Sequence, residues 1–513
     1  MYAAGTQVWL AFGLYLAATF YFAYLAHRKT SKTGFMEDFF VAGRSIGPWV
    51  LGLTWIATAA SGGTFIGSPA LGHTYGWSVM LWICSYMVVA TTGFGLFGKR
   101  VAELGARTGA LTFPDLLRDR FDSRAIGTVS GVAIIILYIA YLVAQYVAGA
   151  RVIEAVLGVP YHWGVLGFAL TVSLYTAYGG FRAVAWTDAF QAIVMLTGVL
   201  ITVFFAIRKL GGLQAVYDGL EAQTPDLLTT PGPTDFLPIP TAISFFCIWA
   251  LASPAQPSTI TRFLACRDTK ALKRACFLIG IYISLLYPCI IGIGIMGRVL
   301  VPELAAADHA TPATILAVVP PVLAGFVLAA PLAAIMSTIS SFLLVTSSAI
   351  VRDLYERNLP ERLTEKRARY LSYLATFAVA GVALAFALQP PDFLQFIVVF
   401  AGTGLAATFF FPTLLGVYWP RMNKAGCLAG IAGGFLSFLL QYVSFGTRSF
   451  GGFDPFVWSM IVSLACVVTA SLATPPGAES LRERYFPKVQ RQAARPVLRL
   501  RAIRRTMGSA PST

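Results

Sequence analysis

The sequence of 513 residues contains few charged side chains. Asp, Glu, Lys and Arg make up 12% of it, about half of what is usual for a soluble protein, whereas 57% of the residues are hydrophobic. Only four histidines are present, and no two of them stand at helical spacing. The composition therefore excludes an ordinary soluble domain and indicates neither a histidine proton relay nor a zinc site.

Cysteines are also few and scattered. No pair has metal-ligand spacing, and no cluster suggests a disulfide framework, so we interpret the seven as small apolar residues. No nucleophile, base and orienting group occur together within the apolar segments, and an enzyme is not expected. The cysteines are Cys84, Cys247, Cys266, Cys276, Cys289, Cys427 and Cys466.

Long apolar runs fill nearly the whole chain, each near the roughly 20 residues that a membrane helix needs. They predict an all-α polytopic membrane protein with thirteen transmembrane helices. The runs are Val8–Leu25, Ile46–His73, Trp77–Phe97, Ile126–Val156, Trp163–Tyr178, Trp186–Ile207, Ile239–Ala265, Ala275–Met296, Val322–Ile350, Tyr370–Leu388, Phe393–Val417, Ala425–Val443 and Phe456–Leu472.

Lys and Arg are concentrated on alternate connections between these runs. Counted from the first connection and including the tail, those segments hold 33 of the 38 basic residues. Cytoplasmic loops of membrane proteins carry such an excess. The pattern predicts a multi-pass protein of the cell (inner) membrane, with its N-terminus outside and a basic cytoplasmic tail, residues 474–513. We expect the tail to lie near anionic lipid rather than nucleic acid, because it has no aromatic stacking pattern.

Two of the runs are interrupted by helix breakers. The first contains Ala60-Ser61-Gly62-Gly63-Thr64, and the second, five spans later, contains Ser253-Pro254-Ala255-Gln256-Pro257. Unpaired backbone inside a bilayer is costly unless it lines a cavity or binds something. Because five is odd, the second group of spans enters the membrane inverted. The sequence thus predicts a symporter domain, residues 1–473, with inverted five-helix repeats at about 46–207 and 239–417 and a binding site at the breaks.

The ninth run carries candidate cation ligands. Ala334, Ser337 and Thr338 share one helical face and offer two hydroxyls and a carbonyl. Such hydroxyls often bond only their own helix backbone. Beside an unwound segment with free carbonyls at Ala57 and Ala60, a site for a monovalent cation becomes the better interpretation, because calcium or magnesium usually needs carboxylates.

Polar and aromatic residues near the breaks predict a substrate pocket. The ends of the broken helices are expected to expose N–H groups suited to an anion. Ordinary packing is an equally good explanation for any single aromatic residue here. Asp188 opens the sixth run and would cap that helix or act as an intracellular gate. The pocket residues are Ser61, Gly62, Thr64, Tyr141, Gln145, Trp249, Ser253 and Gln256.

Several motifs, in order between about Val8 and Leu472, resemble those of the sodium:solute symporter family. The resemblance implies the inverted-repeat fold of the leucine transporter. It also implies sodium bound by the carbonyls of Ala57, Ala60 and Ala334 and the hydroxyls of Ser337 and Thr338. The motifs are Ala148-Gly149-Ala150-Arg151, Gly179–Asp188 followed by Gln191 and Met195, Gln256-Pro257 with Arg262-Phe263, Ala334–Ser341 with Ser347-Ser348-Ala349, and Arg352-Asp353-Leu354-Tyr355.

The resemblance leaves the solute open, since family members carry proline, sugars, sialic acid, pantothenate and short monocarboxylates. Proline transporters of the family carry an aspartate where this chain has Ala59, which counts against proline. The segments Thr64–Pro69, Val159–Tyr161 and Leu328–Ala334 resemble the pantothenate branch. The sequence therefore predicts sodium-coupled import of a small organic carboxylate, such as pantothenate or a monocarboxylate, by alternating access.

Other functions remain as alternatives. The first is a symporter for a neutral or zwitterionic solute, such as proline or a sugar. A membrane sensor module is less favoured, because the tail is too short for an output domain, and a channel lacks a visible selectivity filter. The sequence leaves the oligomeric state and the sodium stoichiometry open.

Overall fold

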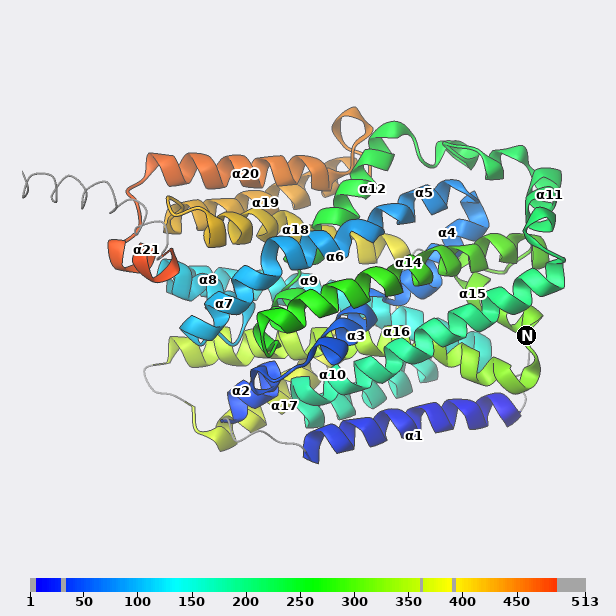
Figure 1. Cartoon of the computed structure of the whole chain (residues 1–513), viewed down its shortest axis with the longest axis horizontal. Helices are drawn as coiled ribbons and strands as arrows, with labels where there is room; N and C mark the ends of the chain where they lie inside the picture. Colours follow the sequence, from blue (N-terminus) through cyan, green and yellow to red (C-terminus); the bar gives the residue numbers. More distant parts are fainter. Residues whose placement is uncertain (1–5, 29–33, 360–362, 390–393, 487–513) are drawn as a thin grey trace, which may run out of the picture.

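The computed structural model describes residues 6–28, 34–359, 363–389 and 394–486 of the chain. Long helices run side by side along the longest axis of the molecule (Figure 1). Within the described residues there is no β-strand, and a single isolated β-bridge joins Ile46 and Cys266. The predicted all-α class is confirmed.

The helices follow one another with short connections. In chain order they are α1 Thr6–Arg28, α2 Phe35–Val41, α3 Pro48–Ala59, α4 Ser68–Tyr75, α5 Ser78–Cys84, α6 Val89–Thr92, α7 Lys99–Thr108, α8 Phe113–Phe121, α9 Arg124–Leu157, α10 Tyr161–Leu210, α11 Leu213–Gln223, α12 Ile239–Leu251, α13 Pro257–Ala265, α14 Thr269–Leu300, α15 Ala310–Val318, α16 Pro321–Ser348, α17 Glu365–Ala387, α18 Leu394–Tyr418, α19 Lys424–Phe445, α20 Pro455–Ala473 and α21 Glu479–Tyr485.

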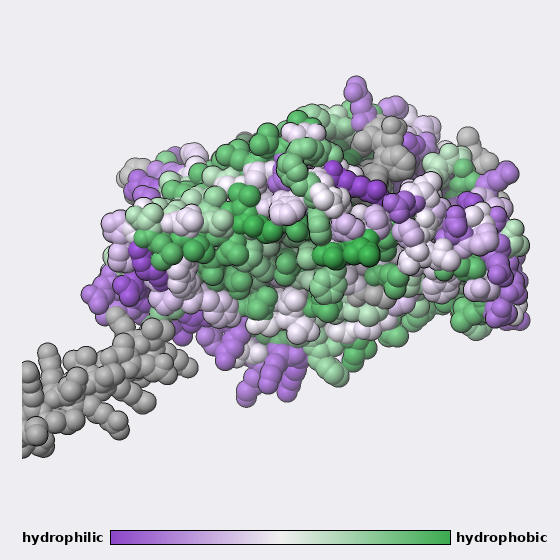
Figure 2. Space-filling model, turned by 90° about the horizontal axis from the view of Figure 1, so that it is seen from above, coloured by the Kyte–Doolittle hydropathy of each residue, from purple (hydrophilic) through white to green (hydrophobic). Residues whose placement is uncertain are grey.

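The apolar helices are long enough to cross a membrane. Ten helical segments among the described residues have the necessary length and hydropathy, and two bent pairs raise the number to 12. The 50-residue α10 contains a non-helical Gly180, with φ 58° and ψ −169°, where the chain passes from the predicted fifth run to the sixth. The predicted count of thirteen spans itself stays a prediction. Hydrophobic side chains cover the middle of the face seen in Figure 2, and hydrophilic ones gather toward its two ends.

Both predicted interruptions are confirmed. Helix α3 and the segment 63–75 meet at an angle of 59°, and the segment 239–255 and α13 meet at 44°. The ends of the two broken helices lie together, since Ile46 N donates to the carbonyl of Ala265 at 3.2 Å and Arg267 N donates to the carbonyl of Ile46 at 3.0 Å. The start of one broken helix is therefore joined to the end of the other.

Helix α16 forms the centre of the bundle. Every residue from Val327 to Ala349 is buried, and the helix packs against α1, α3, α9 and α10. The hydroxyl-bearing stretch 337–341 lies within this buried part. Hydroxyl groups placed there have only protein atoms or a bound ligand as partners, because neither lipid nor bulk water reaches them.

The beginning of the predicted tail packs on the protein. Tyr485, at the end of α21, is fully buried, and its ring lies 5.3 Å from the Arg120 guanidinium. The Arg100 guanidinium donates to the Tyr485 carbonyl at 2.5 Å. The remainder of the tail, from residue 487, lies outside the described residues, so its predicted position near lipid remains a prediction.

A close contact between α14 and α4 supplies a test of this packing. A Cβ at Gly294 would lie 2.1 Å from the carbonyl oxygen of Pro69. We expect Gly294→Ala to lower the free energy of unfolding by about 1–3 kcal/mol, the usual cost of overpacking. Gly280→Ala in the same helix has nothing within 4 Å and should leave the stability unchanged or raise it. Equal thermal unfolding of the two purified variants would contradict the contact.

Candidate functional site

Two hydroxyl groups of α16 contact the backbone of α3 just before its break. The Ser337 hydroxyl lies 2.7 Å from the carbonyl oxygen of Ala57 and 2.9 Å from that of Ala334. The Thr338 hydroxyl lies 3.0 Å from the Ala334 carbonyl and 3.1 Å from the carbonyl of Thr58. Four of the five predicted cation ligands therefore meet at one place, together with Thr58, which the sequence did not single out.

The fifth predicted ligand, Ala60, lies at the break itself. Its backbone has left the helix, with φ −82° and ψ 86°, and its carbonyl accepts no hydrogen bond from any described residue. The oxygen atoms gathered here are all neutral and their residues are buried. Such a set suits a monovalent cation better than calcium or magnesium, which usually take carboxylates. Their role as sodium ligands remains a prediction.

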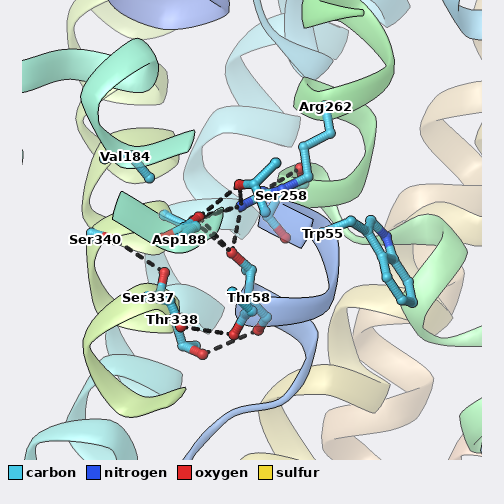
Figure 3. A network of polar contacts seen from close by, with 12 residues as sticks. Trp55, Thr58, Val184, Asp188, Ser258, Arg262, Ser337, Thr338 and Ser340 are labelled. Carbon is cyan, nitrogen blue, oxygen red and sulfur yellow. Dashed lines mark hydrogen bonds and ion pairs between the residues drawn. The ribbon is translucent and has the colours of Figure 1, made fainter. Parts of the chain in front are cut away.

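A buried ion pair lies about one helical turn from these hydroxyls (Figure 3). Arg262 of α13 donates to Asp188 of α10 at 3.1 Å, and the exposed fractions of their side chains are 1% and 0%. The Thr54 hydroxyl donates to the same carboxylate oxygen at 2.7 Å. Arg262 also donates to the hydroxyls of Thr58 and Ser341. One guanidinium thus connects α3, α10 and α16 to α13.

The predicted capping role of Asp188 is wrong. The helical conformation resumes after Gly180, so Asp188 lies two turns inside the helix, and its carboxylate bonds to side chains of other helices. Burial explains the difference. A carboxylate buried in the core is costly unless it has a cation and hydrogen-bond donors as partners. The position agrees with a gate between helices, which remains a prediction.

At the first break, a side chain of α9 supplies the missing backbone partner. Gly62 N donates to Gln145 Oε1 at 2.8 Å, and Gly63 N donates to the Ser61 hydroxyl at 3.2 Å. A Cβ at Gly62 would lie 2.8 Å from the Cβ of Ala148. Gly62 is therefore required by close approach of α9, and Gln145 stabilises the unwound segment.

At the second break, the expected free N–H groups are not found. Ser258 N donates to the hydroxyl of Tyr138 at 3.0 Å. Thr259 N donates to the carbonyl of Gln256 at 2.9 Å, and Gln256 N donates to that of Ser253 at 3.2 Å. The prediction that this backbone is open to an anion is wrong, because a short turn and a tyrosine of α9 occupy its donors.

A narrow cavity of about 30 Å³ lies between the two breaks. Six of the eight predicted pocket residues line it, whereas Gly62 and Gln145 lie behind the first break. The indole N–H of Trp249 is buried and has no hydrogen-bond partner, so it is a donor available to a solute. The predicted residues that line the cavity are Ser61, Thr64, Tyr141, Trp249, Ser253 and Gln256.

Other residues of this region are not predicted from the sequence. Arg262 belongs to one of the family motifs but is given no role from the sequence, yet it is buried in α13 and also borders the cavity. A usable signal existed, because an arginine and an aspartate placed within or beside apolar runs are costly unless they pair. Tyr86 and Tyr287 line the cavity as well, with ring centroids 4.4 Å apart. Nothing in their spacing distinguishes them from packing residues.

Comparison with known proteins agrees with this geometry. The profile of the sodium:solute symporter family matches residues 39–434. A sodium/pantothenate symporter of Haemophilus influenzae is 34% identical over 93% of this chain and 97% of its own length. A high-affinity proline transporter of Bacillus subtilis is 30% identical over 90% and 97%. The structure of a sodium-coupled sialic acid symporter superposes with a TM-score of 0.77 at 19% identity, covering 93% of this chain and 99% of that one.

The apolar helices and the paired helix breaks define a multi-pass membrane protein with the leucine-transporter fold. The chain belongs to the sodium:solute symporter family. The fold and the family that the sequence motifs implied are thereby confirmed.

The buried ion pair yields a prediction about stability. Asp188→Asn leaves the Arg262 charge without its counter-ion, and we expect it to lower the free energy of unfolding by about 3–5 kcal/mol. The double variant Asp188→Asn/Arg262→Leu should recover part of this loss, because the unpaired charge is removed as well. Unfolding in mixed micelles would measure both.

The exposed pair of Arg267 and Asp268, whose side chains are 60% and 42% exposed, offers a matched control. Asp268 also accepts from Ala271 N, so the variant to use is Arg267→Gln, which should change the stability by less than about 1 kcal/mol. An Asp188→Asn protein as stable as the unmodified one would show that the pair is not buried as described.

Proposed function

We propose that this protein imports a small organic carboxylate, pantothenate being the first candidate, by coupling its movement to sodium. The observation that carries the proposal is the shared use of one segment of α3. Ala57 and Thr58 present carbonyls to the hydroxyls of α16, while Thr58, Ala59 and Ser61 line the cavity. A cation bound on one side of this segment and a solute on the other side would stabilise the same backbone conformation.

Coupling follows from that arrangement. If sodium orders the unwound segment, the solute binds to a surface that is already formed, and the solute favours sodium binding by the same factor. The helix break allows this because the regular helix ends directly after Ala59, and the carbonyl of Ala60 accepts no hydrogen bond from any described residue. In this proposal the sodium ligands are Ala57, Ala60, Ala334, Ser337 and Thr338.

A carboxylate solute agrees with the walls of the cavity. Trp249 offers an unpartnered indole N–H, and several tyrosine and serine residues also line the cavity. The buried Asp188 is already paired with Arg262, and among the described residues no carboxylate lines this cavity to attract an amine. Ala59, the position that counts against proline, lines the cavity. The relative from Haemophilus influenzae, which is named a sodium/pantothenate symporter, supports the same choice.

Alternating access requires the bundle to open at the end opposite the solute entrance. The Asp188–Arg262 pair joins α3, α10, α13 and α16 beside the cation site (Figure 3). We assign this pair the part of an intracellular gate, with the N-terminus of the chain outside. Separation of the pair would release α13 from α10 and connect the site to the cytoplasm.

The cation site predicts a loss of sodium affinity in Thr338→Ala. Removing one neutral ligand should raise the sodium concentration for half-maximal uptake about tenfold, which corresponds to one hydrogen bond of a charged group. Thr346→Ala is the matched control, because its hydroxyl donates to the carbonyl of Phe342 in the same helix at 2.7 Å. Uptake into proteoliposomes, measured over a range of sodium concentrations, tests this prediction. Identical sodium dependence in both variants would remove Thr338 from the site.

Competition between the acid and its amide tests the solute class. Pantothenate should inhibit uptake of labelled pantothenate at least about tenfold better than the uncharged amide of the same molecule. Trp249→Phe keeps an aromatic ring but removes the N–H, and should reduce this preference. Equal inhibition by both compounds, or preferred uptake of labelled proline, would overturn the carboxylate assignment while leaving sodium symport intact.

A further inference from the structure

A second cavity lies between α4, α5, α12 and the connection before α20. Its volume, about 180 Å³, exceeds that of the narrow cavity between the helix breaks. It lies at the end of the molecule that the charge distribution predicts to face outside. Among the residues lining it are Trp82, Phe236, Thr241, Tyr442, Arg448 and Asp454.

Aromatic rings connect this second cavity to the site at the helix breaks. Tyr75 and Phe236 stack with centroids 4.0 Å apart. The ring centroid of Trp82 lies 6.2 Å from that of Phe236 and 6.1 Å from that of Trp249. Trp249 in turn lines the cavity between the breaks. Val399 borders both cavities. A solute in the second cavity therefore lies against the same wall that continues into the inner cavity.

Arg448 places a positive charge at the edge of the second cavity. Its guanidinium is exposed, and one nitrogen donates to the carbonyls of Asp235 at 3.0 Å and Phe236 at 3.5 Å. No described carboxylate forms an ion pair with it. The two backbone contacts orient the planar group and leave the N–H donors of its other two nitrogens open to an acceptor in the cavity.

Polar groups without partners lie on the remaining walls. Trp82 is 3% exposed, and its indole N–H has no hydrogen-bond partner. The buried Thr241 hydroxyl also lacks one. Asp454 on the same wall does have a partner, since one of its carboxylate oxygens accepts a hydrogen bond from Phe456 N at 2.8 Å. Buried polar groups are normally paired, so the unpaired donors indicate a surface that binds hydroxyl, amide or carboxylate groups of a solute.

We infer that the second cavity is an entry site, in which Arg448 captures the carboxylate of the solute before it passes along the aromatic wall to the helix breaks. The inference rests on the proposed transport of an organic carboxylate and adds a binding site to it. A cation at the edge of a cleft with apolar walls raises the local concentration of an anionic solute and its rate of association. The inner cavity, at about 30 Å³, has to open before it can admit such a molecule.

Kinetics of uptake into proteoliposomes test the entry site. Arg448→Gln should raise KM for labelled pantothenate about five- to tenfold with kcat unchanged, because the charge acts on capture and not on the later steps. Arg448→Lys should restore part of the loss. Arg208→Gln removes an exposed charge at the end of α10, away from the cavity, and serves as the matched control with unchanged KM.

Equilibrium binding in sodium-free buffer distinguishes this site from the inner one, because only the inner site is expected to lose affinity for the solute when sodium is absent. We expect weak binding of labelled pantothenate that Arg448→Gln abolishes and that the uncharged amide does not displace. If KM and sodium-free binding are the same in Arg448→Gln and in the unmodified protein, the inference is overturned, although sodium-driven uptake still supports the proposed function. If sodium-free binding depends on Arg448 but sodium drives no uptake, the entry site stands and the proposed function fails.

Discussion

The backbone groups released at the two helix breaks have to find partners within the protein, because the interior of a bilayer offers none. Gln145 and Tyr138 of α9 accept hydrogen bonds from Gly62 N and Ser258 N, and hydroxyls of α16 approach the carbonyls that precede the first break. This requirement fixes how closely α9 and α16 pack against the breaks. It also explains why polar side chains occupy the most buried part of the bundle.

The same constraint brings two kinds of polar site next to each other. The neutral oxygens around Ser337 suit a small cation, and the ion pair of Asp188 and Arg262 lies about one turn away. Thr58 belongs to both, since its carbonyl faces Thr338 and its hydroxyl contacts Arg262. A change in the conformation of this short stretch therefore alters the cation site, the ion pair and the cavity together. Packed interiors shift between discrete arrangements rather than deforming continuously, which is what coupling of sodium to a solute requires.

Predictions from the sequence were good where the signal is local. Apolar runs and breaker residues located the helices and both interruptions. A membrane helix or a break in it depends on a short stretch of chain and on the bilayer around it. The 3.6-residue period placed Ser337 and Thr338 on one face of α16. Predictions were poorer where several helices contribute. The donors of the second break were expected to be free, yet Tyr138, more than a hundred residues away in the chain, accepts one of them.

The sequence by itself determined that the chain is an all-helical membrane protein, where its helices break, and which oxygen atoms are candidates for a cation, because composition, periodicity and motifs carry that information. Only the tertiary structure decided that Asp188 pairs with Arg262, that Gln145 supports the break instead of lining the cavity, and that Arg448 borders a second cavity. Each of these depends on which groups from distant parts of the chain are brought together in space, and a hydrogen bond between two such groups requires about 3 Å. The sequence pattern of a single helix does not specify which groups of other segments lie that close to it.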